Sequence, residues 1–363
     1  MLYSKHHYSD NFCKSVFNDC LNSIQTQTSF NLIAMPGVGV TFFLKALAQN
    51  NPDNFMFVNS YEMRDFSKSA FYEQLSDKLG IEFSEPISLQ KISKALNSKA
   101  EKLDRLVMVF NRLDRLSEIL DQNFYDNMRF LRDAFRNKIV MIFVSSRPMF
   151  ELSSANFKDA LSLVTKTIYF PVYSDTDLIE ISRSSSSALI DKTALAFSGG
   201  HHALLQVLLR CQNLDNPLPD PMVEMLIKDI YFGLDVNRRK QLETFVLRSV
   251  EPKDQLLTGL GYIKNSQAFT PLLSNYIKSL GKSHLPVKEK RLMRLLTIHK
   301  DKVVSKEEIF DYVWPEKSGI ASEWALNALI YRLRRHVAFD NERYSIESRK
   351  KDGYLLIDHS SRN

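Results

Sequence analysis

The stretch AMPGVGVTFFLKAL, from Ala34 to Leu47, contains the turn around which the first half of the chain is organised. An apolar run over residues 30–33 precedes it, and a segment with helical periodicity follows from residue 40. The connection carries Gly37 and Gly39, and glycine tolerates the backbone angles that a tight turn requires. Taken alone, the stretch predicts a buried strand, a glycine-bearing turn and a helix.

The same stretch partly matches a phosphate-binding loop of the form G-x-x-x-x-G-K-[ST]. In that loop the glycines let backbone N–H groups surround the phosphates, the lysine contacts the β- and γ-phosphates, and the hydroxyl holds Mg²⁺. Gly39 and Thr41 occupy the second glycine and hydroxyl positions, whereas Ala34 replaces the first glycine and Val40 replaces the lysine. A degenerate nucleotide site and a purely structural turn both stay open at this point.

Strand-like and helix-like segments alternate over the first 172 residues. Short runs rich in Val, Ile and Phe predict strands at 30–35, 55–59, 106–110, 139–144 and 166–170. Helical periodicity predicts helices at 40–49, 66–79, 89–103 and 116–136. This alternation favours a parallel sheet covered by helices on both sides, in which ligands bind beyond the carboxyl ends of the strands.

Composition narrows the class of protein. The chain has 363 residues, 44% hydrophobic and 25% charged, which is ordinary for a globular protein of two or three domains. A net charge of +6 permits nucleic acid as a partner without requiring it. The three cysteines have no metal-binding spacing, and no apolar run is long enough to span a membrane. We therefore expect a cytoplasmic protein with no membrane partner.

A second motif follows the third predicted strand. The sequence RLVMVFNRLDRL, from Arg105 to Leu116, resembles the second motif of ATPases of the additional-strand P-loop class, in which Asp-Glu follows four apolar residues. There the Asp holds Mg²⁺ through water and the Glu activates the attacking water. Asn111 and Arg112 stand at these two positions; Asn has no charge for the metal, and Arg cannot act as a base near neutral pH.

Two further segments extend this resemblance. MIFVSSRPMF places Ser145, Ser146 and Arg147 where the class carries a residue that senses the γ-phosphate. AFSGGHHALLQVLL resembles the lid turn of signalling ATPases, with His202 at a position where proline is usual. His201 and His202 are interpreted as capping or surface residues rather than metal ligands, so no metal site is predicted.

Residues 34–212 together resemble the AAA/STAND-type P-loop ATPases. The resemblance implies a P-loop NTPase-like sheet with a helical lid, but the lysine, the metal ligand and the base are all replaced. We therefore expect a pseudo-ATPase with no catalytic residue and no cofactor, because these three groups contribute independently to phosphoryl transfer. Backbone N–H groups at a helix N-terminus still make ATP or ADP binding conceivable. The residues of this degenerate site are Gly37, Gly39, Thr41, Asn111, Arg112 and Arg147.

The segment from Arg291 to Leu356 carries the landmarks of a winged helix in order. They are Leu292, Leu295 and Leu296 on a first helix, Ser305 before a second helix, Trp314 at its end, the Arg332-Leu333-Arg334 triplet, and Gly353-Tyr354 in a terminal hairpin. The segment resembles the OmpR/PhoB-type winged-helix domain, which implies binding to double-stranded DNA through a recognition helix around residues 327–337.

The helical pattern of residues 321–337 agrees with that resemblance. Leu326, Leu329, Ile330, Leu333 and Val337 form one apolar stripe. Trp324 is a candidate either for the core or for stacking on the DNA backbone. Polar groups off the stripe and cations of the hairpin are candidates for base and phosphate contacts. These candidates are Asn327, Tyr331, Arg332, Arg334, Arg335, Arg349, Lys350 and Lys351.

Four segments follow from these patterns: a degenerate P-loop NTPase-like α/β core (1–172), a helical lid (173–216), a helical or winged-helix-like middle segment (217–282) and a winged-helix (α+β) domain (285–358). We expect a non-catalytic DNA-binding transcriptional regulator whose core serves protein interaction, self-association or sensing. The alternatives are a catalytically silent subunit of an ATP-dependent DNA-bound or defence assembly, and an interaction scaffold whose winged helix binds protein. The expected partners are double-stranded DNA and, through the core, a protein or a second copy.

Overall fold

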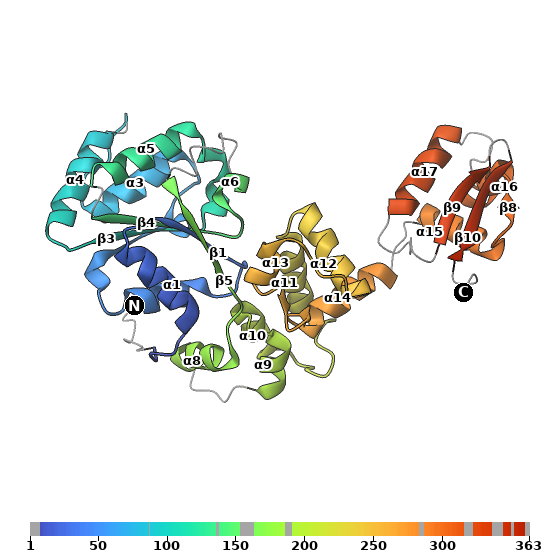
Figure 1. Ribbon diagram of the computed structural model, residues 1–363, viewed down its shortest axis with the longest axis horizontal. Helices are drawn as coiled ribbons and strands as arrows, with labels where there is room; N and C mark the ends of the chain where they lie inside the picture. The colour runs from blue at the N-terminus through green and yellow to red at the C-terminus, as the bar shows by residue number, and fades with distance from the viewer. Residues whose placement is uncertain are drawn as a thin grey trace. The chain divides into compact units, whose positions relative to one another are not determined.

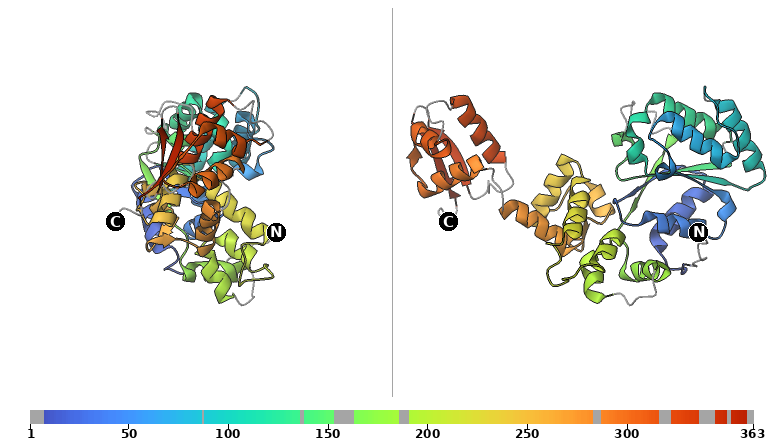
Figure 2. Two further views of the ribbon diagram at one scale, coloured as in Figure 1. Left: turned by 90° about the vertical axis from the view of Figure 1, so that its right-hand side faces the viewer. Right: turned by 180° about the vertical axis from the view of Figure 1, so that it is seen from behind.

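The computed structural model describes residues 8–86, 88–135, 138–152, 163–185, 191–282, 287–315, 322–335, 344–349 and 352–359. The chain divides into two compact units. The first comprises residues 1–242 and 251–273, and the second comprises residues 243–250 and 274–363. Figures 1 and 2 show the elements of each unit.

A five-stranded parallel sheet forms the centre of the first unit. Its strands are β1 (Phe30–Ala34), β2 (Phe55–Asn59), β3 (Leu106–Asn111), β4 (Ile139–Ser145) and β5 (Lys166–Phe170). They lie in the order β2-β3-β4-β1-β5, and every neighbouring pair is parallel. Strand β4 is thus inserted between β1 and β3, which is the arrangement that the additional-strand P-loop class implies. The predicted fold class is confirmed.

Helices cover both faces of this sheet. Helices α3 (Lys68–Leu79), α4 (Leu89–Glu101) and α5 (Gln122–Asp133) lie on one face, and α1 (Lys14–Gln25) lies on the other (Figure 1). Helix α2 (Val40–Ala48) packs beside α1, where the rings of Phe17 and Phe43 meet edge to face at 6.3 Å. Every residue of β1, β3 and β4 is buried, as expected for strands with both faces covered.

Two helices depart from the sequence-based expectation. Helix α1 was not predicted, although Val16, Cys20 and Ile24 recur every fourth residue and are buried. The helix predicted from residue 116 begins at Gln122 instead, because residues 113–119 form a 3₁₀ segment, η3 (Leu113–Ile119). Asp121 then caps α5, its carboxylate accepting from the backbone N–H of Phe124 at 2.9 Å.

The chain beyond β5 becomes helical. The lid contains α8 (Asp175–Ser185), α9 (Lys192–Ser198) and α10 (His202–Leu208). It is followed by α11 (Pro221–Phe232), α12 (Val236–Arg248), α13 (Gln255–Gly259), the hairpin β6 (Ile263–Lys264) and β7 (Gln267–Ala268), and α14 (Pro271–Lys282). The boundary between the two compact units passes through α12 and α14. No helix within the described ranges is long and apolar enough to cross a membrane.

The second unit contains the predicted winged helix. Helices α15 (Val287–Ile298), α16 (Lys306–Val313) and α17 (Glu323–Arg335) accompany an antiparallel sheet of β8 (Val303–Val304), β10 (Gly353–Asp358) and β9 (Tyr344–Arg349), in that order. Their apolar side chains form one core. Leu326, Leu329, Ile330 and Leu333 are buried in it, which confirms the predicted stripe of α17; position 337 lies outside the described residues.

Gly353 is required where the hairpin meets β8. Its φ is +136°, and a Cβ atom there would lie 1.8 Å from the carbonyl oxygen of Val304. Any side chain at this position would therefore separate β10 from β8.

Candidate functional site

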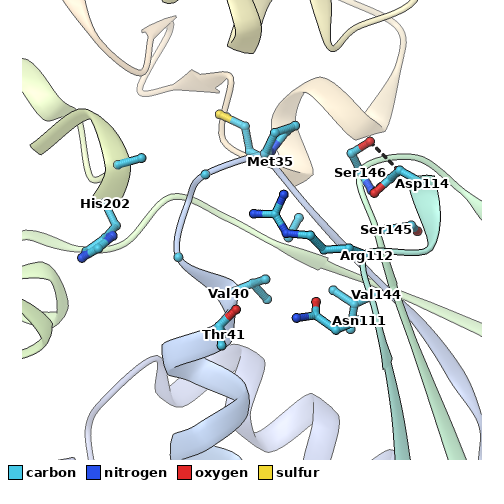
Figure 3. A pocket seen from close by; sticks show the side chains of 15 residues that line it. Met35, Val40, Thr41, Asn111, Arg112, Asp114, Val144, Ser145, Ser146 and His202 are labelled. Atoms are coloured by element: carbon cyan, nitrogen blue, oxygen red, sulfur yellow. Dashed lines mark hydrogen bonds between the residues drawn. The ribbon is translucent and has the colours of Figure 1, made fainter. Parts of the chain in front are cut away.

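The turn of the quoted stretch borders a cavity of about 270 Å³ (Figure 3). The cavity lies at the carboxyl ends of β1, β3 and β4, and the start of α10 closes one side. Gly37 and Gly39 have φ of +77° and +99°, a region that favours glycine, and Gly39 is the N-cap of α2. Except for Arg147, all the residues predicted for the degenerate nucleotide site line this cavity.

The positions that would carry ATPase chemistry have other side chains and other partners. Val40 lies at the start of α2, and Asn111 ends β3, 6% exposed, with no hydrogen-bond partner for its Oδ1 among the described residues. Arg112 has a φ of +60° and reaches into the cavity in Figure 3, its guanidinium 4.5 Å from the ring centroid of Tyr61. The cavity therefore presents a cation where a general base would be needed.

Asp114 is the only carboxylate among the described residues that line the cavity. Its Oδ1 accepts from the backbone N–H of Ser146 at 2.8 Å and from the hydroxyl of the same residue at 2.7 Å. These bonds join the end of β3 to the end of β4. Across the described ranges, no group of three or more His, Cys, Asp or Glu side chains could hold a metal ion.

Four consecutive carbonyl groups of the turn, those of residues 36–39, accept hydrogen bonds from the lid and from the loop after β5. His201 Nε2 donates to the carbonyl of Pro36 at 2.8 Å, and the backbone N–H groups of Ala203 and His202 donate to Gly37 and Val38 at 3.0 and 3.4 Å. The Tyr173 hydroxyl, just beyond β5, donates to the carbonyl of Gly39 at 2.8 Å. The outer edge of the turn is thus held by the lid and the β5 loop. We name this set of bonds the turn–lid joint.

His201 is the central side chain of the turn–lid joint. It is fully buried and caps α10, because its Nδ1 accepts from the backbone N–H of Leu204 at 3.2 Å. An accepting Nδ1 requires the tautomer that carries its proton on Nε2, the atom facing Pro36. Burial lowers the pKa of His201 to about 4, so the ring is neutral near neutral pH. The interpretation of His201 as a cap is confirmed.

His202 has a different environment from its neighbour. Its ring packs on Phe42 with centroids 4.7 Å apart, and its Nε2 has no hydrogen-bond partner among the described residues. Burial also lowers the pKa of His202. The predicted surface position therefore does not apply to His202, which is half-buried against α2.

Two contributors to this region were missed from the sequence. Asn31 lies inside the buried strand β1, donates to the Phe143 carbonyl and Ser145 Oγ at 2.7 and 2.8 Å, and accepts from the Met149 N–H at 3.1 Å. A polar residue within an apolar run was the available signal, since a buried amide requires partners. Tyr173 lies two residues after Pro171 in an irregular segment, where no periodic pattern marks a role.

The second candidate site is the outer surface of α17. Tyr331 is 58% exposed and Trp324 is 79% exposed, which excludes Trp324 from the core. Asn327 is exposed, and its Oδ1 accepts from the Tyr354 hydroxyl at 2.6 Å. The side chain of Arg335, together with Lys350 and Lys351, lies outside the described residues.

The other predicted DNA-contacting arginines have partners within their own domain. Arg332 Nε donates to Glu289 Oε1 at 2.8 Å; the Glu289 side chain is 5% exposed. Arg334 donates to the carbonyl of Ile346 in β9, and Arg349 pairs with Glu347 at 2.9 Å. Arg332 therefore has a structural contact that the sequence pattern did not reveal.

The C-terminal domain matches a known family model. Residues 281–356 match the family model "Transcriptional regulatory protein, C terminal". No curated protein matches the chain.

Among solved structures, the chain is similar to a Walker-type ATPase of Pyrococcus abyssi, with 13% identity, a TM-score of 0.45, and coverage of 77% of this chain and 99% of that chain. It is also similar to the ORC1 protein of Aeropyrum pernix, solved in complex with DNA, with 11% identity, a TM-score of 0.40, and coverage of 95% and 88%. The chain thus joins a five-stranded parallel α/β core to a C-terminal winged helix that matches the transcriptional regulatory, OmpR/PhoB-type family model.

Proposed function

We propose that the protein is a non-catalytic, DNA-binding transcriptional regulator. The observation that carries this proposal is the exposed face of α17 within a domain that matches transcriptional regulatory proteins. The C-terminal half of this helix carries Arg332, Arg334 and Arg335, against a single acidic residue, Glu323, at its start. Such a helix suits the major groove, where side chains contact bases while cations contact phosphates.

The core is proposed to be catalytically silent. Phosphoryl transfer depends on a lysine at the phosphates, on Mg²⁺ and on a group that positions or activates the nucleophile. Val40, Asn111 and Arg112 supply none of these, and Asp114 already binds Ser146. The turn–lid joint supports a structural role for the former nucleotide loop, as the connection between the sheet and the lid.

The core is also proposed to mediate regulation through protein contacts. A partner protein or a second copy of the chain would bind the core. The turn–lid joint already connects the lid of that core to the turn. In this scheme the signal that reaches the winged helix comes from assembly and not from ATP turnover.

Duplex binding at several salt concentrations tests the proposal. The full-length chain would be titrated into a fluorescent duplex, by anisotropy, between about 50 and 200 mM salt. We expect affinity to fall steeply with salt, because each neutralised phosphate contributes about 0.9 to the log–log slope. Replacing Arg334 and Arg335 together with alanine should weaken binding and lower the slope by up to about two.

Arg64→Ala is the matched control, since Arg64 is 67% exposed and lies in the first unit. It should leave both affinity and slope unchanged. Absence of duplex binding by the natural chain at low salt would refute the proposal.

A further inference from the structure

The face of α17 that points away from the core has an unusual composition. Successive residues of a helix are rotated by about 100°, so residues seven apart lie on the same side. The buried residues Leu326, Leu329, Ile330 and Leu333 define the inner side. Trp324 and Tyr331 lie opposite, two turns apart, and are 79% and 58% exposed. We name these two side chains the aromatic ridge.

Polar side chains beside the aromatic ridge have restricted hydrogen-bonding capacity. Asn contacts adenine by using its oxygen and its NH₂ group together. The Oδ1 of Asn327 already accepts from the Tyr354 hydroxyl, which ties the orientation of the amide to β10 and leaves one lone pair of this oxygen for a base. Arg332 is anchored to Glu289 on α15, and Arg334 to the carbonyl of Ile346 on β9.

The major groove displays one apolar group, the C5-methyl of thymine. Aromatic and other apolar side chains recognise it by contact, without hydrogen bonds. An aromatic ridge flanked by the cationic end of α17 is therefore complementary to a thymine-bearing groove between phosphates. The flanking cations favour a polyanion over an apolar protein surface as the occupant.

We infer that Trp324 and Tyr331 select the DNA target by contacting thymine methyl groups in the major groove. This inference rests on the proposed function and adds the chemical basis of its specificity. The sequence-based expectation included Tyr331 among the candidates for DNA contacts and gave Trp324 either to the core or to the DNA backbone; the inference assigns both side chains to thymine methyl groups.

The test begins with a duplex selected by the full-length chain from a random-sequence library. Each thymine of the selected site is then replaced by deoxyuridine, which removes only the methyl group and keeps the base pair. We expect a loss of about fourfold in affinity at each contacted position, the effect of about 0.8 kcal/mol for one buried carbon group. Positions outside the contact should show no change.

Two variants test whether the aromatic ridge causes the loss of affinity for the deoxyuridine duplex. Trp324→Ala and Tyr331→Ala should each weaken binding to the thymine duplex by at least about fourfold, and each should abolish the difference between thymine and deoxyuridine at the position that the removed ring contacts. Phe232→Ala is the matched control, because Phe232 is a 56% exposed aromatic residue of α11 in the first unit. Circular dichroism of each variant verifies that the fold is kept.

The results distinguish failure of this inference from failure of the proposed function. Duplex binding that is equal for thymine and deoxyuridine at every position would overturn the inference and leave the proposed function standing. Failure to select or bind any duplex would overturn both. If Trp324→Ala leaves DNA binding intact but removes a co-purifying protein, the ridge is a protein contact and the inference is wrong.

Discussion

The cavity of the core and the outer face of α17 differ in how the backbone arrangement and the functional side chains are combined. In the core the glycine-bearing turn, the strand order and the lid are in place, while Ala34, Val40, Asn111 and Arg112 replace the motif's first glycine and the groups needed for turnover. In the winged helix the buried apolar stripe of α17 is in place, and large side chains are exposed on the outer face of the same helix. A family likeness therefore identifies a scaffold, and only the side chains indicate which activity it has retained.

The largest expected effect concerns the structural role of the turn–lid joint. Gly200 has a φ of +90°, and a Cβ there would lie 2.1 Å from the carbonyl oxygen of Tyr173. Gly200→Ala should lower the free energy of unfolding by about 4 kcal/mol, combining overpacking with positive-φ strain. Gly80→Ala is the matched control, since Gly80 has a φ of +69° but open space around it, and should cost only about 1 kcal/mol. Equal losses in denaturant titration would show that close packing at the joint is unimportant.

Acid should weaken the same joint through His201. The folded pKa of His201 is about 4 and its ordinary value is 6.5, so the unfolded chain binds more protons between these limits. His201 thus contributes stability that is complete above pH 6.5 and is lost as pH falls toward 4, by about 3 kcal/mol in total. Urea titrations from pH 7 to pH 4 measure this change, and His201→Gln should flatten the profile. An unchanged pH dependence in that variant would exclude His201 as its source.

The ion pair beneath α17 should affect stability more than DNA recognition. Arg332→Ala leaves the buried carboxylate of Glu289 without its donor and should destabilise the winged helix by about 2 kcal/mol. Its affinity for duplex DNA should fall less than that of the Arg334→Ala/Arg335→Ala variant. Thermal denaturation and anisotropy titration separate the two effects. A large loss of affinity at unchanged stability would instead assign Arg332 to base contact, as the sequence pattern suggested.

The smallest expected effect is that of nucleotide on the natural chain. Calorimetric titration with ATP or ADP, with and without Mg²⁺, should give no binding heat, and saturating nucleotide should leave the unfolding temperature unchanged. The Val40→Lys/Asn111→Asp/Arg112→Glu variant restores the missing groups and should gain affinity that depends on Mg²⁺. Micromolar binding by the natural chain would show that the core still binds nucleotide and would make nucleotide a candidate switch.

The sequence predicted the sheet well because buried parallel strands are continuous apolar runs. All five predicted strands agree with the structure to within one residue at each end. The start of α5 was wrong, since the left-handed backbone of Arg112 and the 3₁₀ segment after it have no periodic signal. The stripe of α17 was predictable from residues three and four apart, because both partners of each contact lie on one helix.

Contacts between distant segments were beyond the sequence pattern. The bond from Arg332 to Glu289 joins residues 43 apart, and that from His201 to Pro36 joins residues 165 apart. Each depends on how separate elements pack, which periodicity within one element does not encode. The sequence therefore predicted the residues of the site that line the cavity, with the exception of Arg147, but did not show what their backbone atoms bind.

The turn–lid joint has a consequence for how such a chain changes over generations. A Cβ at Gly37 would lie 3.0 Å from Cε1 of His201, and one at Gly39 would lie 2.9 Å from Cβ of His202. Packing against the lid therefore restricts substitution of both glycines independently of any phosphate chemistry. In the proposed non-catalytic core these two glycines would persist for packing alone, so a chain of this kind would keep part of the outward signature of an ATPase without the activity.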